Sequence, residues 1–242
     1  MFSIFVLGTL SILGLSKASW PDGRYCLPMP SNRVCPSGWS KGYRRHDVED
    51  DDQKTYCDAR RHGWVPYNSN YCHNLRWGFC CKTRSNYPPT RKTWPKGAYC
   101  IFRYGGRCPR GFATGYHYWD DEDDNNVNSR SGVLPDGWYG RDTKIYFCCR
   151  NDPVKQSFNR INRLYGLPKC SEMILMRYKE KCHPPQSGYL GPHTGYLQWD
   201  TEDNRNRDEH FGVFPDTTKS SGRTFGSGIV IQFCSYTSYY HC

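Results

Sequence analysis

The sequence is poor in aliphatic residues and lacks the motifs of the common catalytic and metal-binding families. Leucine, isoleucine and valine are sparse among its 242 residues. It has no His-Glu-x-x-His, no Gly-x-Ser-x-Gly and no two matching Cys-x-x-Cys pairs, which are the patterns of zinc proteases, serine hydrolases and structural zinc sites. After residue 18 no stretch approaches the roughly 18 apolar residues of a membrane helix. We therefore expect no enzyme, no structural zinc site and no membrane span.

The first residues have the pattern of a secretory signal peptide. An almost unbroken apolar run from Met1 to Leu15 precedes Ser16-Lys17-Ala18, which places small residues at the two positions that signal peptidase reads. We expect cleavage after Ala18, so that residues 1–18 are the signal peptide and residues 19–242 are the mature chain. The protein is then secreted to the extracellular space.

Cysteines and aromatic residues compensate for the scarce aliphatic ones. The 14 cysteines are an even number in a chain predicted to be secreted, which favours disulfides over free thiols. With 19 Tyr, 11 Phe and 8 Trp, the core is expected to consist of rings and cross-links. The formal net charge of +10 favours contact with anionic surfaces such as bacterial walls or sulfated glycans.

One pattern occurs three times in the chain. The string Gly-Tyr-x-x-(His/Trp)-Asp-x-Glu-Asp begins at Gly42, Gly115 and Gly195. Each copy also has a cysteine near a proline upstream, a Gly-x-x-Pro step downstream and a Phe-Cys step at its end. Anchors that recur in one order indicate an internal repeat. We place the first, second and third copies at approximately residues 20–82, 94–150 and 166–242.

The copies are predicted to be built from short β-strands. Residues 144–149 and 229–234 are runs of β-branched and aromatic residues, and Gly and Pro recur about every ten residues. We expect a mainly β, disulfide-rich fold with three internal repeats of short strands. A copy of about 70 residues with a thin core is small for an independent domain, so the three are expected to close into one pseudo-threefold body.

The repeat also predicts the disulfide pattern. The cysteine near the proline and the first cysteine of the Phe-Cys step occur in every copy, which predicts Cys35–Cys80, Cys108–Cys148 and Cys182–Cys234. The first two copies have an opening cysteine and a second terminal cysteine, which predict Cys26–Cys81 and Cys100–Cys149, because adjacent residues of a strand face opposite sides. The remaining cysteines predict Cys57–Cys72 in the first copy and Cys170–Cys242 in the third, where the opening cysteine is displaced to Cys170.

The acidic part of the motif allows two interpretations. Its carboxylates are Asp47, Glu49, Asp50, Asp120, Glu122, Asp123, Asp200, Glu202 and Asp203. The favoured interpretation is a structural turn whose carboxylates cap backbone amides and pair with nearby arginines. The alternative is Ca²⁺, which takes several oxygen ligands, although the EF-hand spacing is absent. No other cofactor is expected.

The repetition itself argues against catalysis. Paired carboxylates hydrolyse glycosides in many enzymes, but an active site is seldom built three times in equivalent positions. His46 stands where the other copies have Trp119 and Trp199. We therefore expect His46 to fill space rather than to react.

Several of these strings resemble the ApeC domain, the C-terminal domain of the apextrins of invertebrate animals. The resemblance is carried by Trp94-Pro95-Lys96-Gly97-Ala98-Tyr99-Cys100, Cys108-Pro109-Arg110-Gly111, Tyr118-Trp119-Asp120-Asp121-Glu122-Asp123, Leu134-Pro135-Asp136-Gly137 and Phe147-Cys148-Cys149-Arg150. With Trp20-Pro21 and Trp199-Asp200 it extends over nearly the whole mature chain. Cys57 and Cys72 depart from the family pattern.

The resemblance implies a secreted innate-immune protein that binds bacterial cell-wall glycans, especially peptidoglycan and muramyl dipeptide, and agglutinates bacteria. Exposed aromatic rings stack on sugars, and polar groups orient them. Core packing is nonetheless the commoner role of any one Trp in a chain with few aliphatic residues. The candidate glycan contacts are Trp119, Trp199, Tyr116, Tyr196 and Arg141.

Basic residues are expected to meet the anions of the wall, because arginine binds them with forked geometry. Besides Arg141 these are Arg44, Arg45, Arg60, Arg61 and Arg150. The expected partner is bacterial wall polysaccharide or peptidoglycan, not nucleic acid, and the oligomeric state is left open. The alternative function is a structural or adhesive protein of the extracellular matrix.

Overall fold

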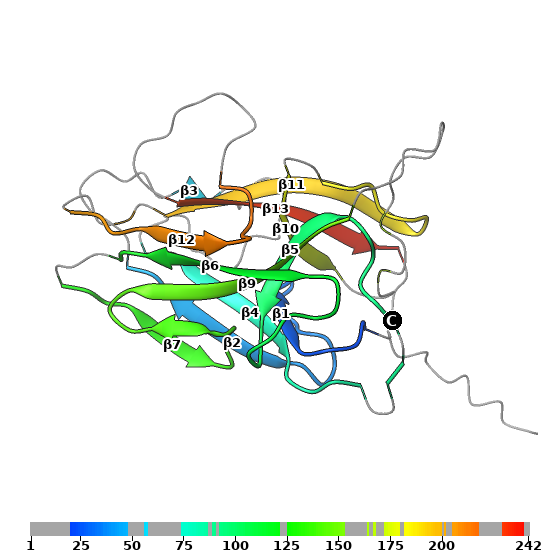
Figure 1. Cartoon of the computed structure of the whole chain (residues 1–242), viewed down its shortest axis with the longest axis horizontal. Helices are drawn as coiled ribbons and strands as arrows, with labels where there is room; N and C mark the ends of the chain where they lie inside the picture. Colours follow the sequence, from blue (N-terminus) through cyan, green and yellow to red (C-terminus); the bar gives the residue numbers. More distant parts are fainter. Residues whose placement is uncertain are drawn as a thin grey trace, which may run out of the picture.

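The computed structural model describes residues 20–47, 56–57, 74–86, 89–90, 92–121, 125–152, 164, 167, 172–179, 182–199, 201, 205–217 and 229–239. Within these ranges the protein is all β, with 13 strands in one antiparallel sheet and no helix. Most strands run along the long axis of the molecule (Figure 1). They are β1 (Tyr25–Pro28), β2 (Ser40–Arg45), β3 (Tyr56–Cys57), β4 (Arg76–Lys82), β5 (Ala98–Arg103), β6 (Ala113–Trp119), β7 (Ser129–Gly132), β8 (Gly137–Tyr139), β9 (Thr143–Asn151), β10 (Met173–Arg177), β11 (Tyr189–Trp199), β12 (Glu209–Gly212) and β13 (Ile229–Ser238).

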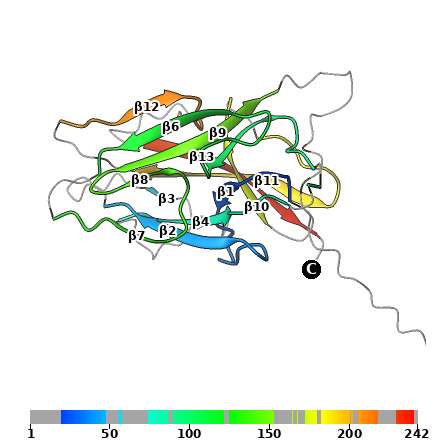
Figure 2. The ribbon, with the colours of Figure 1, turned by 60° about the horizontal axis from the view of Figure 1, so that its bottom comes forward.

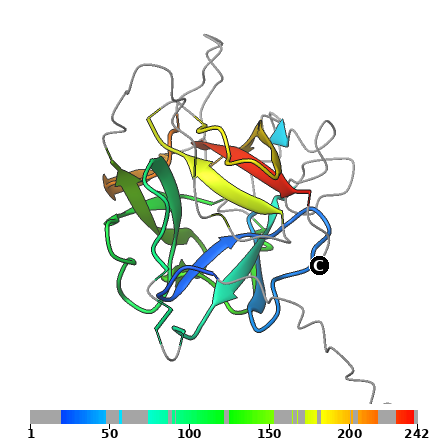
Figure 3. The same cartoon turned by 90° about the vertical axis from the view of Figure 1, so that its right-hand side faces the viewer.

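Three antiparallel strand pairs form the centre of the sheet. β1 pairs with β4, β5 with β9, and β10 with β13. The three pairs are joined because β5 also pairs with both β1 and β10. Viewed from one end, the blue and cyan pair β1–β4, the green pair β5–β9 and the yellow and red pair β10–β13 surround a common centre (Figure 3). The sheet is therefore curled rather than flat.

The strand with the Gly-Tyr step lies beside the closing strand of each copy. β2 pairs with β4, β6 with β9, and β11 with β13. In all three pairs the glycine lies opposite the phenylalanine of the Phe-Cys step: Gly42 opposite Phe79, Gly115 opposite Phe147 and Gly195 opposite Phe233. The sequence motifs thus occupy the same register in each pair.

A short strand from a different copy extends the sheet beyond each Gly-Tyr strand. β2 pairs with β7 of the second copy, β6 with β12 of the third, and β11 with β3 of the first. A Cβ atom at Gly42 would lie 1.9 Å from the carbonyl oxygen of Val133, and one at Gly115 would lie 2.2 Å from that of Val213. The motif needs glycine because the incoming chain passes this close.

Five disulfides lie within the described residues, and each joins the partners that the repeat predicts. Cys26–Cys81 and Cys100–Cys149 link directly opposite residues of neighbouring strands. The other three tie the loop before a Gly-Tyr strand to the closing strand: Cys35–Cys80, Cys108–Cys148 and Cys182–Cys234. The predicted pairs Cys57–Cys72 and Cys170–Cys242 involve side chains outside the described residues.

The third copy differs where the other two have their first disulfide. Ile174 of β10 lies opposite Ser235 of β13, in the register that Cys26 and Cys81 occupy in the first copy. Both residues are buried. A buried isoleucine and a buried serine therefore occupy the position of the cross-link.

The core is aromatic, as the composition predicts. Its largest fully buried side chains include Trp77, Trp119, Trp199, Phe79, Phe102, Phe147 and Phe233. A second cluster contains the opening Trp-Pro-x-Gly-x-Tyr motif. There the Tyr25 hydroxyl donates to the Pro21 carbonyl at 3.0 Å, and the Tyr99 hydroxyl donates to that of Pro95. The motif is thus a structural corner that gives each buried tyrosine hydroxyl a partner.

Candidate functional site

The first aspartate of the acidic motif fastens one copy to the next. The Asp47 carboxylate accepts a hydrogen bond from the backbone N–H of Val127. The backbone N–H of Asp47 donates to the Asn128 side chain at 2.7 Å. Asp120 makes the same two contacts one copy further along, with the N–H of Arg207 at 2.7 Å and the side chain of Asp208 at 2.9 Å. Both carboxylates are buried and cap a backbone amide, which is the role that the favoured interpretation gives them.

The remaining acidic candidates lie outside the described residues. They are Glu49, Asp50, Glu122, Asp123, Asp200, Glu202 and Asp203. Within the described ranges no three histidine, cysteine or acidic side chains gather as a metal site would require. Calcium binding by these turns stays a prediction.

A buried ionic cluster lies at the seam between the first two copies. Asp121 accepts hydrogen bonds from Arg44 at 3.2 Å, from Asn128 at 3.0 Å and from Thr143. His46 Nδ1 lies 3.1 Å from the same carboxylate. Burial lowers the pKa of His46, although Asp121 acts in the opposite direction. The cluster joins side chains of the first two copies across the seam, and removing one of its charges would leave the other buried without a counter-ion.

Trp119 and Trp199 are core residues, which contradicts their prediction as glycan contacts. Both are 0% exposed. With His46 they form a triangle of rings whose centroids lie 5.5, 5.6 and 5.7 Å apart. A sugar stacks on a ring only where the face is open to solvent. The aromatic position of the motif therefore serves packing, and His46 fills space there as expected.

The basic candidates divide between core and surface. Arg44 and Arg150 are 1% and 7% exposed, and Arg150 donates to the Trp94 carbonyl at 2.8 Å. The prediction that these two arginines bind wall anions is wrong, because both are buried and are hydrogen-bonded to partners inside the protein. Arg45 and Arg141 are exposed. Arg60 and Arg61 lie outside the described residues.

A set of aromatic side chains lies on the outside of β12, β6, β9 and β8, which run side by side (Figure 2). We call it the outer aromatic face, and it consists of Phe211, Tyr116, Tyr118, Tyr146 and Trp138. Phe211, Tyr116 and Tyr146 lie opposite one another in register, with successive ring centroids 6.0 and 5.5 Å apart. Phe211 is 69% and Trp138 is 50% exposed. Aromatic rings gathered on one surface make this face a candidate interaction site.

Charged groups stand among these rings. The Lys144 Nζ atom lies 3.6 Å from the Tyr116 ring centroid and 3.6 Å from a carboxylate oxygen of Glu209. The Tyr116 hydroxyl donates to Glu209 at 3.0 Å. The face thus presents an ammonium and a carboxylate beside an exposed phenylalanine, the combination that orients a polar ligand on an apolar surface.

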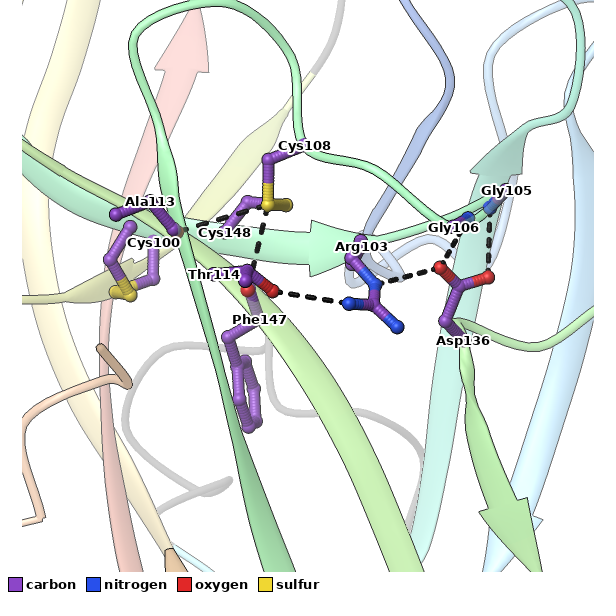
Figure 4. Close-up of a disulfide and its surroundings, with 11 residues drawn as sticks. Cys100, Arg103, Gly105, Gly106, Cys108, Ala113, Thr114, Asp136, Phe147 and Cys148 are labelled. Carbon is purple, nitrogen blue, oxygen red and sulfur yellow. Dashed lines mark hydrogen bonds and ion pairs between the residues drawn. A yellow bond between two sulfur atoms is a disulfide. The ribbon is translucent and has the colours of Figure 1, made fainter. Parts of the chain in front are cut away.

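Arg103 borders the face through Tyr146 and is held by Asp136, as Figure 4 shows for the latter contact. Its guanidinium carbon lies 3.8 Å from the Tyr146 ring centroid, and its Nε donates to Asp136 at 2.9 Å. Asp136 in turn accepts the N–H groups of Gly105 and Gly106 at 2.8 and 2.7 Å. Arg103 is the last residue of β5, and the loop that follows it is tied to β9 by Cys108–Cys148. The cation is therefore preorganised rather than free to move.

Of the predicted contacts, only Tyr116 lies in the outer aromatic face. Tyr196 is half-buried on β11 opposite Gln232, and the carbonyl of Arg141 accepts hydrogen bonds from the side chains of Asn126 and Asn128. Sequence reasoning missed Phe211, Tyr118, Trp138, Tyr146 and Lys144. Tyr146 and Lys144 belong to one strand, β9. Alternation along residues 143–147 is the signal for two of them, because every second side chain of a strand faces outward.

Fold and cross-links define a disulfide-linked, all-β domain of the kind found in extracellular proteins. The chain matches the ApeC family, the C-terminal domain of apextrin, over residues 20–236, and it belongs to this family. ApeC is not a known catalytic family. No curated protein and no solved structure matches the chain. In the part of the chain that the structure describes, no helix is long and apolar enough to cross a membrane.

Proposed function

We propose that this protein is a secreted innate-immune recognition protein that binds bacterial cell-wall glycans through the outer aromatic face. The observation that carries the proposal is Phe211, 69% exposed and in register with Tyr116 and Tyr146. Sugars offer apolar C–H faces to rings and hydroxyls to polar groups. Phe211 supplies the ring, while Glu209 and Lys144 supply the polar partners.

Secretion and the immune role are supported from two other directions. The disulfides need an oxidising compartment, and the family match begins at residue 20, two residues after the end of the predicted signal peptide. Membership of the ApeC family supports peptidoglycan and muramyl dipeptide as the ligands.

We further propose that the three copies form one pseudo-threefold body. Three observations support it: the shared register of the Gly-Tyr and Phe-Cys steps, the ring triangle of His46, Trp119 and Trp199, and the cyclic exchange in which each copy receives a strand from another. In such a body the same surface position occurs three times with different side chains.

The test is sedimentation of the purified full chain with insoluble peptidoglycan. Phe211→Ala is expected to weaken binding about 2- to 10-fold, the usual worth of one aromatic contact. Tyr239→Ala removes another exposed ring, 59% exposed, at the end of β13 and is expected to bind as the unmodified protein does. Absence of the unmodified protein from the pellet at physiological salt would count against recognition and favour the matrix role.

A further inference from the structure

A second surface site lies where β2 meets β7 of the next copy. It is a groove of about 280 Å³ lined by Tyr43, Arg45, Arg76, Ser129, Arg130 and Ser131. All except the half-buried Tyr43 are exposed. The groove therefore combines the guanidinium groups of Arg45 and Arg76 with three hydroxyl groups on an open surface.

Two arginines of the groove are placed close together in spite of their like charge. Arg45 lies directly opposite Arg76 across β2 and β4, whereas Arg130 lies opposite the buried Arg44 across β2 and β7, so the register places its side chain on the other face of the sheet. Like charges directly opposite each other on neighbouring strands are destabilising. Among the described residues no carboxylate lies within ion-pair distance of Arg45 or Arg130. An anion bound beside Arg45 adds a counter-charge at this position.

The hydroxyl groups of the groove favour an anion with several oxygen atoms. Ser129 lies opposite Arg45, Ser131 lies opposite Tyr43, and the Arg76 guanidinium carbon lies 4.3 Å from the Tyr43 ring centroid. Guanidinium groups donate pairs of hydrogen bonds to oxyanions, and hydroxyls add further donors. Donors from three strands around one hollow suit an anion with several oxygens pointing in different directions.

The equivalent surface position on β6, β9 and β12 has the opposite chemistry. The strand registers show which residues are equivalent. Tyr118 occupies the position of Arg45, and Lys144 occupies that of Arg76. Glu209 occupies the position of Ser129. The Lys144–Glu209 ion pair of 3.6 Å satisfies that cation within the protein. The β2–β7 groove is thus the cationic one of these two positions.

We propose that the groove binds phosphate or sulfate esters carried on a polyol or glycan chain. The site is separate from the outer aromatic face and does not depend on it. Its chemistry is common to the glycerol phosphate polymers of bacterial walls and to the sulfated glycans of animal matrices.

The experiment measures binding of the full chain to immobilised polyglycerol phosphate and to dextran sulfate, with uncharged dextran as the control polymer. We expect binding to at least one ester and none to dextran. Arg45→Gln is expected to lower the affinity about 10-fold, the usual loss for a charge-assisted hydrogen bond to a charged group. Raising the salt concentration should weaken binding, because exposed charges are screened.

Two control variants make the test specific. Arg110→Gln removes the same charge from an exposed arginine in another turn, and Lys144→Gln alters the equivalent position on β9. Both are expected to leave ester binding within about 2-fold of the unmodified protein, as is usual for a surface charge away from the site. Binding to neither ester, or an equal loss in Arg45→Gln and Arg110→Gln, overturns the proposal. Phe211→Ala is expected to leave ester binding intact, so failure of the ester proposal is distinguishable from failure of the peptidoglycan proposal. The polymer that binds, polyglycerol phosphate or dextran sulfate, shows whether the natural ligand is a bacterial wall polymer or a sulfated matrix glycan.

Discussion

His117 makes this fold sensitive to acid in a way that one substitution removes. The imidazole is 4% exposed on β6, against the rings of Trp119, His210 and Phe214, and neither ring nitrogen has a hydrogen-bond partner. Burial, with a smaller contribution from His210, lowers its pKa from 6.5 to about 3. The third copy has Leu197 at the same register of β11. His117→Leu therefore places there a side chain that a homologous position of this protein already accommodates.

The sign of the effect follows from which state binds the proton. Between pH 6.5 and about pH 3 the imidazole of the unfolded chain is protonated while the buried one is not. Acid therefore favours unfolding, and the stability is lost as the pH falls below 6.5. Each pH unit below the unfolded pKa costs about 1.4 kcal/mol. At pH 4.5 the loss from His117 alone is about 3 kcal/mol.

The measurement is urea unfolding of the oxidised protein at pH 7 and at pH 4.5. His117→Leu should lose about 3 kcal/mol less between the two pH values than the unmodified protein does. The buried His46, whose pKa is also lowered, is present in both proteins and cancels. His193→Gln, on an exposed histidine of β11, should show the unmodified loss. Equal losses in all three proteins would refute the reasoning.

Three further substitutions test the seam and the cross-links. Gly42→Ala should destabilise the protein by about 2 kcal/mol or more, because the new methyl group overlaps the Val133 carbonyl; chemical denaturation measures it. Asp121→Asn should cost about 3–5 kcal/mol by leaving a buried arginine without its counter-ion, which a fall in melting temperature reports. Replacing Cys26 and Cys81 together by alanine opens a loop of 55 residues, and should cost about 4 kcal/mol in denaturant unfolding. A change below 1 kcal/mol in any of them would contradict the corresponding contact.

The disulfides and the β class could be predicted because each position of the motif occurs three times in the sequence and can be compared between copies. Cys35, Cys108 and Cys182 each pair with the cysteine that follows phenylalanine in their own copy. The strand register makes this pairing geometrically possible. Strand exchange between copies could not be predicted, because Tyr56–Cys57 carries no signal of its distant partner β11.

The candidate site was predicted less well than the fold. Trp119 and Tyr116 belong to the same strand, and only the alternation of side chains across it sends the first into the core and the second outward. From residue type alone, Trp119 and Tyr116 are equally suited to stacking on a sugar. Phe211 was missed because it comes from a four-residue strand that belongs to the third copy but pairs with the second.

The exchange of edge strands also sets the order in which the protein is completed during synthesis. Each of the five disulfides closes within a single copy, so those cross-links need only residues that emerge together. The edges of the sheet need residues from elsewhere: β2 awaits the second copy, β6 awaits the third, and β3 finds β11 only after most of the chain has been made. Until then the earlier copies carry open strand edges, which are prone to pair with other chains. The outer edge of β6 therefore stays open until β12 of the third copy has been made.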